Sequence, residues 1–218
     1  MSAVNADPFR VVRDFEAALC AYTGAPYAVT VNSCTSAILL TVAWYRHVQN
    51  RFAEPTGIQI TPHFFLPAHT YPSVPMSIRH AGGSVEFTQE DWIGAYALGN
   101  TGANIWDCAC RFTGGMYVPG QVQCVSFHAR KLLKLGHGGA ILHDNAEADA
   151  WYRKARFDGR TEGVPTAHDQ CTMLGWHCYM LPEEAARGLH LLSYYPTEMP
   201  DLPRDEYPDL SQWPIFRT

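Results

Sequence analysis

The segment Ser126-Phe-His-Ala-Arg-Lys131, followed shortly by Gly136-His-Gly-Gly139, places a lysine between two apolar runs. The runs at 121–127 and 139–143 are typical of short strands, so the lysine falls in the turn that joins them. A lysine in such a turn can reach into a pocket, form a Schiff base with a carbonyl compound and then act as a general base. The glycines permit a tight turn and a close approach of the backbone.

The same segment also fits a basic surface patch beside a hairpin, because Arg130 and Lys134 flank the lysine. The residues alone do not decide between a patch and a reactive lysine. The chain contains 16 lysines and arginines, of which only Lys131, Lys134 and Lys154 are lysines. If the chemistry requires a lysine amine, the candidates are therefore few, and two of them lie in this segment.

Strands and helices alternate through about residue 150. Periodicity predicts helices over residues 9–22, 37–48, 71–80 and 144–157. Further short strands are predicted over 27–31, 58–66, 84–87 and 103–107. This alternation favours an α/β domain, over residues 1–193, with a mainly parallel sheet flanked by helices. The tail at 194–218 carries five prolines and many acids, and we expect an extended arm there.

Two further groups follow predicted strands. Asn32-Ser-Cys-Thr-Ser36 precedes a helix, where free N–H groups and the helix dipole can bind a phosphate, helped by the hydroxyls of Thr35 and Ser36. A plain helix N-cap is the simpler interpretation of that turn. Asp107 ends another strand, where open α/β sheets bind ligands, and its carboxylate can hold a pyridinium N–H. A helix cap or a salt bridge also explains this aspartate.

Composition argues against several classes of function. The chain has 218 residues, 47% of them apolar and 17% charged, which suits one folded domain. With a net charge of −5, nothing points to nucleic acid or an anionic membrane as a partner. No apolar run reaches the roughly 18 residues of a membrane helix, and residues 1–13 do not resemble a signal peptide. Seven scattered cysteines predict reduced thiols and a cytoplasmic protein.

The lysine segment, together with Gly138-Gly139-Ala140, resembles the S-F-H-x-x-K…G-G-A signature of the DegT/DnrJ/EryC1/StrS aminotransferases. Other segments resemble that family in the same order along residues 9–192: the strand and phosphate turn ending at Ser36, Leu66-Pro-Ala-His-Thr-Tyr71, Ala81-Gly-Gly-Ser-Val-Glu-Phe87, Trp106-Asp-Cys-Ala109, and Leu174-Gly-Trp176 with Glu184-Ala-Ala186. Each motif alone is weak, but their collinear agreement is a specific signal.

The resemblance implies a fold-type I enzyme that uses pyridoxal 5'-phosphate (PLP), from a family best known for aminating keto sugars attached to nucleotides. It implies Lys131 as the Schiff-base lysine and Asp107 as the partner of the pyridine nitrogen. It implies six further cofactor contacts: Thr35, Ser36 and Ser126 at the phosphate, Tyr71 stacked on the ring, Cys110 and His177. It also implies an amino acid donor, glutamate or glutamine, a keto or aldehyde acceptor, and a homodimer with shared active sites.

Several positions depart from the family pattern. Cys34 stands where the phosphate turn usually has glycine, and Cys110 stands where a Gln or His usually contacts the cofactor. His177 replaces an Asn that reaches the phosphate from the neighbouring subunit, and Tyr179 replaces an Arg. The sequence is also short for the family, so we expect the C-terminal small domain to be largely absent, with the arm at 194–218 taking part of its place.

Three alternatives stay open. A PLP-dependent sugar dehydratase of the same family is disfavoured, because those relatives carry a histidine at the position of Lys131. A non-catalytic protein on a PLP scaffold is motivated by the short length and by Cys34, Cys110 and Tyr179. A zinc enzyme would use Cys108 and Cys110, but no histidine pair lies near them at ligand spacing, so we expect no metal. These two cysteines are expected to be buried instead.

Overall fold

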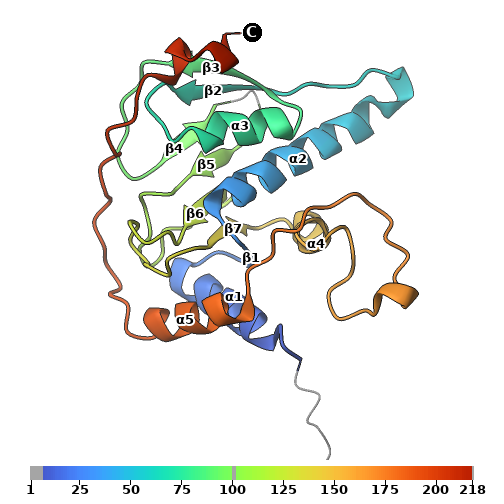
Figure 1. Ribbon diagram of the computed structural model, residues 1–218, viewed down its shortest axis with the longest axis vertical. Coiled ribbons are helices and arrows are strands. Elements are labelled where there is room, and N and C mark those ends of the chain that lie inside the picture. The colour runs from blue at the N-terminus through green and yellow to red at the C-terminus, as the bar shows by residue number, and fades with distance from the viewer. Residues whose placement is uncertain (1–6, 100–101, 218) are drawn as a thin grey trace, which may run out of the picture.

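The computed structural model describes residues 7–99 and 102–217, and Figure 1 shows their helices and strands. The strands are β1 (Tyr27–Val31), β2 (His63–Pro67), β3 (Ser84–Thr88), β4 (Tyr96–Leu98), β5 (Ile105–Asp107), β6 (Val122–Ser126) and β7 (Gly139–His143). The α-helices are α1 (Arg10–Thr23), α2 (Cys34–Ala53), α3 (Ser73–His80), α4 (Ala146–Ala155) and α5 (Pro182–Leu192). None of these helices has the length and apolarity needed to cross a membrane.

Five of these seven strands run in one direction. The larger sheet has the order β1-β7-β6-β5-β4, in which β5 and β6 pair in parallel, whereas β7 opposes both its neighbours and β4 opposes β5. β2 and β3 form a parallel pair, and an antiparallel bridge between Phe65 and Gly99 joins β2 to the end of β4. β1, β2, β3, β5 and β6 therefore point the same way.

The predicted α/β architecture with flanking helices is confirmed, but the sheet is more mixed than predicted. Three of the four pairings in the larger sheet are antiparallel, because β4 and β7 run against the other strands. β4 has only three residues and gives no periodic signal in the sequence. The strand predicted over 58–66 begins only at His63, and the helix predicted over 37–48 extends from Cys34 to Ala53.

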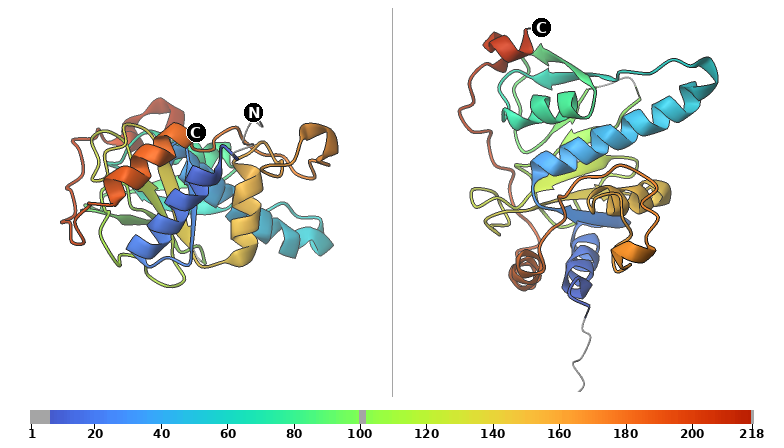
Figure 2. Two further views of the ribbon diagram at one scale, coloured as in Figure 1. Left: turned by 90° about the horizontal axis from the view of Figure 1, so that it is seen from below. Right: turned by 45° about the vertical axis from the view of Figure 1, so that its right-hand side comes forward.

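Helices cover both faces of the sheet, so the molecule has three layers (Figures 1 and 2). Neighbouring residues of one strand enter two different cores. Ile141 of β7 joins the core under α2, α3 and α4, whereas Ala140 and Leu142 join the core under α1 and α5. Cys124 and Val125 of β6 divide in the same way. Because side chains alternate along a strand, a strand covered on both faces is apolar throughout.

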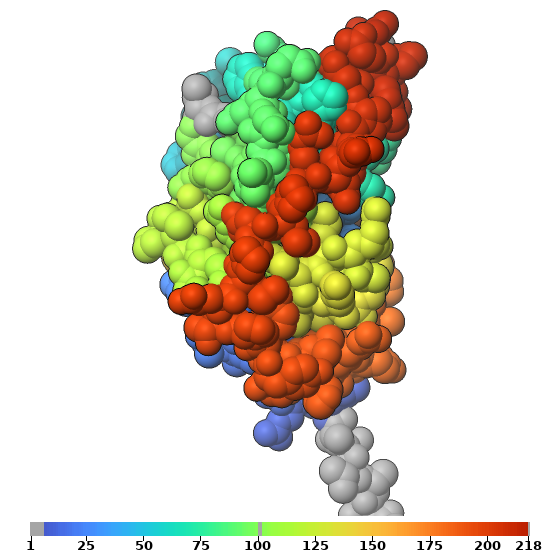
Figure 3. Space-filling view, turned by 90° about the vertical axis from the view of Figure 1, so that its left-hand side faces the viewer, coloured from blue at the N-terminus to red at the C-terminus, as the bar shows by residue number. Residues whose placement is uncertain are grey.

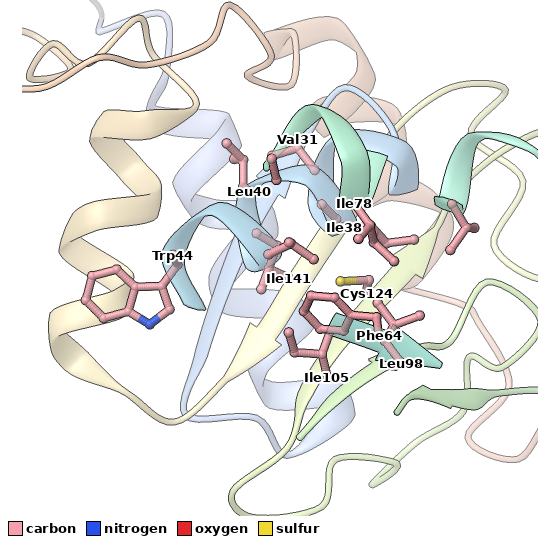
Figure 4. Packing of buried hydrophobic residues seen from close by; sticks show 14 of the residues in the cluster. Val31, Ile38, Leu40, Trp44, Phe64, Ile78, Leu98, Ile105, Cys124 and Ile141 are labelled. Atoms are coloured by element: carbon pink, nitrogen blue, oxygen red, sulfur yellow. The ribbon is translucent and has the colours of Figure 1, made fainter. Parts of the chain in front are cut away.

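The core beneath α2 fixes the position of that helix. Figure 4 shows Ile38 and Leu40 of α2 among side chains from α3 and the strands, including Ile78 and Ile141. All four side chains are fully or almost fully buried. Burial of one such side chain contributes about 1.5–3 kcal/mol, so the helix cannot shift without a large loss of stability. The N-terminus of α2 is therefore held firmly over the end of β1.

A buried ion pair ties α1 to the end of α4. Glu16 Oε1 accepts a hydrogen bond from Arg156 Nη1 at 2.5 Å, and Glu16 Oε2 accepts one from Arg153 Nη1 at 2.7 Å. Burial alone would raise the pKa of the Glu16 carboxyl, but the attraction of Arg156 and Arg153 outweighs it and holds that pKa below its ordinary value of 4.5. The pair therefore stabilises the fold at neutral pH, and this contribution is lost as pH falls through the lowered pKa.

Replacing Glu16 with glutamine is expected to destabilise the protein by about 3–5 kcal/mol, because buried Arg156 then loses the nearer of its two carboxylates and keeps only Glu162, 3.3 Å away. Urea denaturation at pH 7 measures this loss as a lower midpoint with an unchanged slope. Glu147→Gln is the matched control, since Glu147 pairs with Arg51 on the surface, where such a pair contributes at most about 1 kcal/mol. Equal losses in the two variants would contradict the expectation.

After α5 the chain runs back across the molecule in an extended path and ends beside β2 and β3 (Figure 3). Its only helical elements within 193–217 are the short 3-10 helices η3 (Leu210–Gln212) and η4 (Pro214–Phe216). The segment is extended but not loose, because Leu210 and Phe216 are buried and the Leu210 N–H donates to Ala68 O at 3.0 Å. We keep residue 193 as the proposed boundary of the large domain and call residues 194–217 the C-terminal segment.

Candidate active site

The carboxyl ends of β1, β5 and β6 surround a cavity of about 210 Å³. These strands run in the same direction, so their ends meet at one edge, where open α/β sheets bind ligands. Gly139, at the start of β7, pairs with both Val31 and Ser126 and lies between the ends of β1 and β6. The wall of the cavity includes five residues that the sequence predicts for the cofactor: Thr35, Tyr71, Asp107, Ser126 and Lys131.

The N-terminus of α2 faces this cavity. Ser33 is the N-cap, and its hydroxyl oxygen accepts a hydrogen bond from the Ser36 N–H at 3.1 Å. Ser33, Cys34 and Thr35 line the cavity, at the helix end that carries N–H groups without partners in the helix. Gly139 permits this close approach, since a Cβ added there would lie 2.5 Å from Cys34 N. This end of the cavity suits a phosphate.

Cys34 does not disturb this turn, although the family usually has glycine there. It is the first residue of α2, and its Sγ lies 3.6 Å from Cys124 O, below the cavity. Burial raises the pKa of the Cys34 thiol well above its ordinary value of 9.0. The thiol is therefore neutral at physiological pH and adds no negative charge to a turn that suits an anion.

Ser36 is not among the residues that line the cavity, and its contact with the phosphate stays a prediction. Its hydroxyl donates to Asn32 Oδ1 at 2.7 Å and also contacts the Ser33 hydroxyl at 3.1 Å. The physical reason is the helical turn of roughly 100° per residue, which directs Thr35 inwards and Ser36 back toward β1. Thr35 Oγ1 instead shares a hydrogen bond of 2.7 Å with Ser73 Oγ, which brings a second hydroxyl to the wall.

Asp107 is a buried carboxylate at the end of β5, with 4% of its surface exposed. Its Oδ2 accepts a hydrogen bond from Tyr96 Oη at 2.9 Å, and its Oδ1 accepts one from the Ala109 N–H at 2.9 Å. Burial raises the pKa of Asp107, and these two bonds and Lys131 oppose the rise only in part. A cationic N–H brought against Asp107 from the cavity would hold the carboxylate ionised, as the partner of a pyridinium nitrogen requires.

Lys131 enters the cavity from the turn between β6 and β7. Its backbone N–H donates to His128 O at 2.8 Å, which closes the turn, and its side chain is 13% exposed. Its Nζ lies 3.2 Å from Cys110 Sγ and 3.7 Å from Asp205 Oδ2. Cys110, expected at the cofactor, is buried as predicted but places its thiol against the lysine amine and not on the cavity wall.

Two other residues expected at the cofactor lie further out. Tyr71 is 52% exposed at the cavity wall, and its ring packs edge-on against that of Tyr207, with centroids 6.0 Å apart. His177 is not among the residues that line the cavity of its own chain. Its side chain is 68% exposed, and its Nδ1 forms a hydrogen bond of 3.0 Å with Asp158 Oδ2. A contact from His177 to the phosphate of a neighbouring subunit stays a prediction.

The wall also contains residues that the sequence does not single out for the site, among them Trp92, Arg130, His137 and Tyr207. Arg130 is next to Lys131 in the sequence and His137 is six residues after it, so this proximity could have predicted that both lie at the site. Trp92 lies in the loop before β4, where its indole N–H donates to a backbone carbonyl at 3.0 Å. Tyr207 comes from the C-terminal segment, and no local pattern connects it to the lysine.

The chemistry of the wall fits PLP. The α2 N-terminus and the hydroxyls of Thr35 and Ser126 suit the phosphate. Buried Asp107 suits the ring N–H, and the Lys131 amine suits the aldehyde. All of these groups line one cavity, although they come from three separate parts of the chain. The assignments of individual residues to PLP atoms stay predictions.

The sequence matches the model of the DegT/DnrJ/EryC1/StrS aminotransferase family over residues 7–91 and 94–200. No curated protein sequence matches the chain at a significant level. Among solved structures, a protein from Bacillus cereus described as a PLP-dependent aminotransferase has 18% identity and a TM-score of 0.66, over 86% of this chain and 59% of that chain. A sugar aminotransferase from Micromonospora echinospora has 17% identity and a TM-score of 0.66, over 85% of this chain and 61% of that chain. A GDP-4-keto-6-deoxymannose-3-dehydratase has 16% identity and a TM-score of 0.63, over 84% of this chain and 60% of that chain.

The solved structures are distant in sequence and share the fold, and this chain spans 59–61% of the length of the three compared. They confirm the predicted fold of PLP-dependent aminotransferases. The family model covers most of the chain and agrees with the collinear motifs around Lys131 and Asp107. This chain belongs to the DegT/DnrJ/EryC1/StrS aminotransferase family.

Proposed function

We propose that the chain is a PLP-dependent aminotransferase. It moves an amino group from an amino acid donor, glutamate or glutamine, to a keto or aldehyde acceptor, and keto sugars are the first acceptor class to test. The observation that supports this most is the convergence of Lys131, Asp107 and the N-terminus of α2 on one cavity, in a chain of this family. A surface basic patch would not place its lysine in the same cavity as a buried carboxylate.

PLP supplies an electron-accepting ring conjugated to an aldehyde. Of the three lysines, only Lys131 lines the cavity, so its Nζ would hold the aldehyde carbon with release of water and, once the donor amine has displaced it, would move the proton at the donor Cα. Asp107 would hold the proton on the ring nitrogen. Thr35, Ser126 and the N–H groups of the first turn of α2 orient the phosphate end.

Aromatic side chains restrict water at the same cavity. Trp92 is almost fully buried, and its ring packs against that of Tyr96 with centroids 4.8 Å apart. Tyr207 closes another part of the wall from the C-terminal segment. A drier site strengthens the interaction between Asp107 and a ring N–H, because electrostatic attraction grows as the local dielectric falls.

We further propose a homodimer that resides in the cytoplasm. Large apolar side chains at Phe52, Ile58 and Leu174 are exposed, which supports a subunit interface. The seven cysteines are all free, which supports a reducing compartment. Light scattering on the purified protein tests the dimer, and a monomer at micromolar concentration would contradict it.

The transfer activity is tested by one half-reaction. The PLP-loaded protein is mixed with L-glutamate, and in parallel with L-glutamine, without any acceptor. We expect the visible absorption band of the bound cofactor to decay and an equimolar amount of the corresponding keto acid to appear. A protein that binds PLP at Lys131 but releases no keto acid from either donor would instead be a non-catalytic PLP scaffold.

A further inference from the structure

The C-terminal segment is fastened to the rim of the cavity before it passes Lys131. The Leu202 N–H donates to Cys110 O at 2.9 Å, and Leu202 O accepts a hydrogen bond from the Gly94 N–H at 3.0 Å. Asp201 binds Arg111 through two nitrogens, with Oδ2 2.6 Å from Nη2 and Oδ1 3.0 Å from Nε. A backbone hydrogen bond and an ion pair therefore join the loop after β5 to the C-terminal segment.

The segment is fastened again after it passes the lysine. Tyr207 O shares a hydrogen bond of 2.9 Å with His69 Nδ1, and the Leu210 N–H donates to Ala68 O. Figure 3 shows the segment crossing this face of the molecule without leaving its surface. Residues 203–206 therefore cross between two fixed attachments, and their position relative to Lys131 is set by the fold.

Asp205 lies within this crossing and faces Lys131. Its Oδ2 is 3.7 Å from Lys131 Nζ, and the same oxygen accepts a hydrogen bond from Tyr207 Oη at 2.8 Å. That bond is the main cause that holds the pKa of the Asp205 carboxyl below its ordinary value, so Asp205 carries its negative charge at neutral pH. Tyr207 thus orients a charged carboxylate toward the lysine amine.

Other titratable groups surround the lysine, from every element packed around it. They are Asp107 at the end of β5, Cys110 in the next loop, Cys34 at the start of α2, Tyr71 before α3, His128, Arg130 and His137 in the turn that carries the lysine, and Tyr207. The thiols are neutral, because burial raises the pKa of both Cys34 and Cys110. Within residues 7–99 and 102–217, Asp205 alone brings a carboxylate within 4.0 Å of Lys131 Nζ.

We infer that Asp205 is a positioning residue for Lys131, whose carboxylate holds the lysine nitrogen over the cavity and stabilises positive charge on it when PLP is attached. This inference rests on the proposed function, since it takes PLP to be the attached group. It assigns the C-terminal segment a part in the site itself. Asp107 and Asp205 then serve the two ends of the reacting system, one at the ring nitrogen and the other at the lysine nitrogen.

The test follows the pH at which the visible absorption band of the full-length, PLP-loaded protein changes, which reports on the lysine nitrogen without any turnover. Asp205→Asn is expected to lower this midpoint by about one pH unit, since a neighbouring opposite charge favours the charged form. Asp205→Glu is expected to restore most of the shift, and Tyr207→Phe to lower the midpoint by less. Glu206→Gln, the same change at the exposed next residue, is expected to leave the midpoint unchanged.

The outcomes separate the two claims. Equal midpoints for wild type, Asp205→Asn and Glu206→Gln would overturn the role of Asp205 and leave the proposed function standing. No band in the wild type would overturn the proposed function, and the role of Asp205 with it. Circular dichroism shows whether Asp205→Asn is folded. If it is not, Tyr207→Phe decides the question, and a wild-type midpoint in that variant would overturn the inference.

Discussion

Replacing Lys131 with alanine is expected to abolish the visible absorption band that the wild-type protein acquires with PLP. The band requires a protein nitrogen bonded to the cofactor aldehyde, and Lys131 is the one lysine of three that lines the cavity. Transfer activity is expected to fall by roughly 10⁴-fold, because the same nitrogen also moves the proton at the donor Cα. Absorption spectra and keto acid release measure the two effects.

Lys134→Ala and Lys154→Ala are the matched controls for this result. Lys134 is exposed beside the site, and Lys154 lies near the end of α4. Both variants are expected to keep the band and the activity. A band that survives in Lys131→Ala and disappears in either control would move the assignment to that lysine.

Replacing Asp107 with asparagine is expected to leave PLP bound but to slow amino transfer by roughly 10²- to 10⁴-fold. An amide cannot hold a proton on the ring nitrogen by charge, so the ring withdraws electrons less strongly. The fold is expected to survive, because the asparagine side chain still has an oxygen to accept a hydrogen bond from Tyr96 or Ala109. The single-turnover decay of the visible band with the active donor measures the rate.

Asp14→Asn is the control for this variant, because the pair that Asp14 makes with Arg10, 3.9 Å away on α1, is exposed. Its decay rate is expected to match that of the wild type. A wild-type rate in Asp107→Asn would show that this carboxylate does not act on the ring. A large loss of melting temperature would show instead that Asp107 is chiefly structural.

The sequence predicts the parts of the site that follow from local pattern. β7 was predicted with its observed bounds, Gly139–His143, and β1 likewise, because both are short apolar runs between turn residues. Strand ends indicate where ligands bind, which points to Asp107, whereas Ser126 follows from the family resemblance. Lysines are rare in this chain, which leaves two candidates, Lys131 and Lys134, in the turn between two strands, and the family resemblance assigns the reactive one to Lys131.

Other parts of the site depend on contacts between distant residues, which no local pattern encodes. Asp205 meets Lys131 only because Leu202 and Tyr207 are bonded to loops beyond β5 and β2. The composition of the proline-rich tail predicts an extended path but gives no sign that the tail crosses the cavity. The reversal of β4 was missed for the same reason, because strand direction is set by pairing partners.

The most direct test of the central claim is to locate the attached cofactor. The wild-type protein is incubated with PLP and reduced with borohydride, and its peptides are analysed by mass spectrometry. We predict a phosphopyridoxyl group on the peptide that contains Lys131, with Lys134 and Lys154 unmodified. A label on Lys134 or Lys154, or no label on any lysine, would contradict the account.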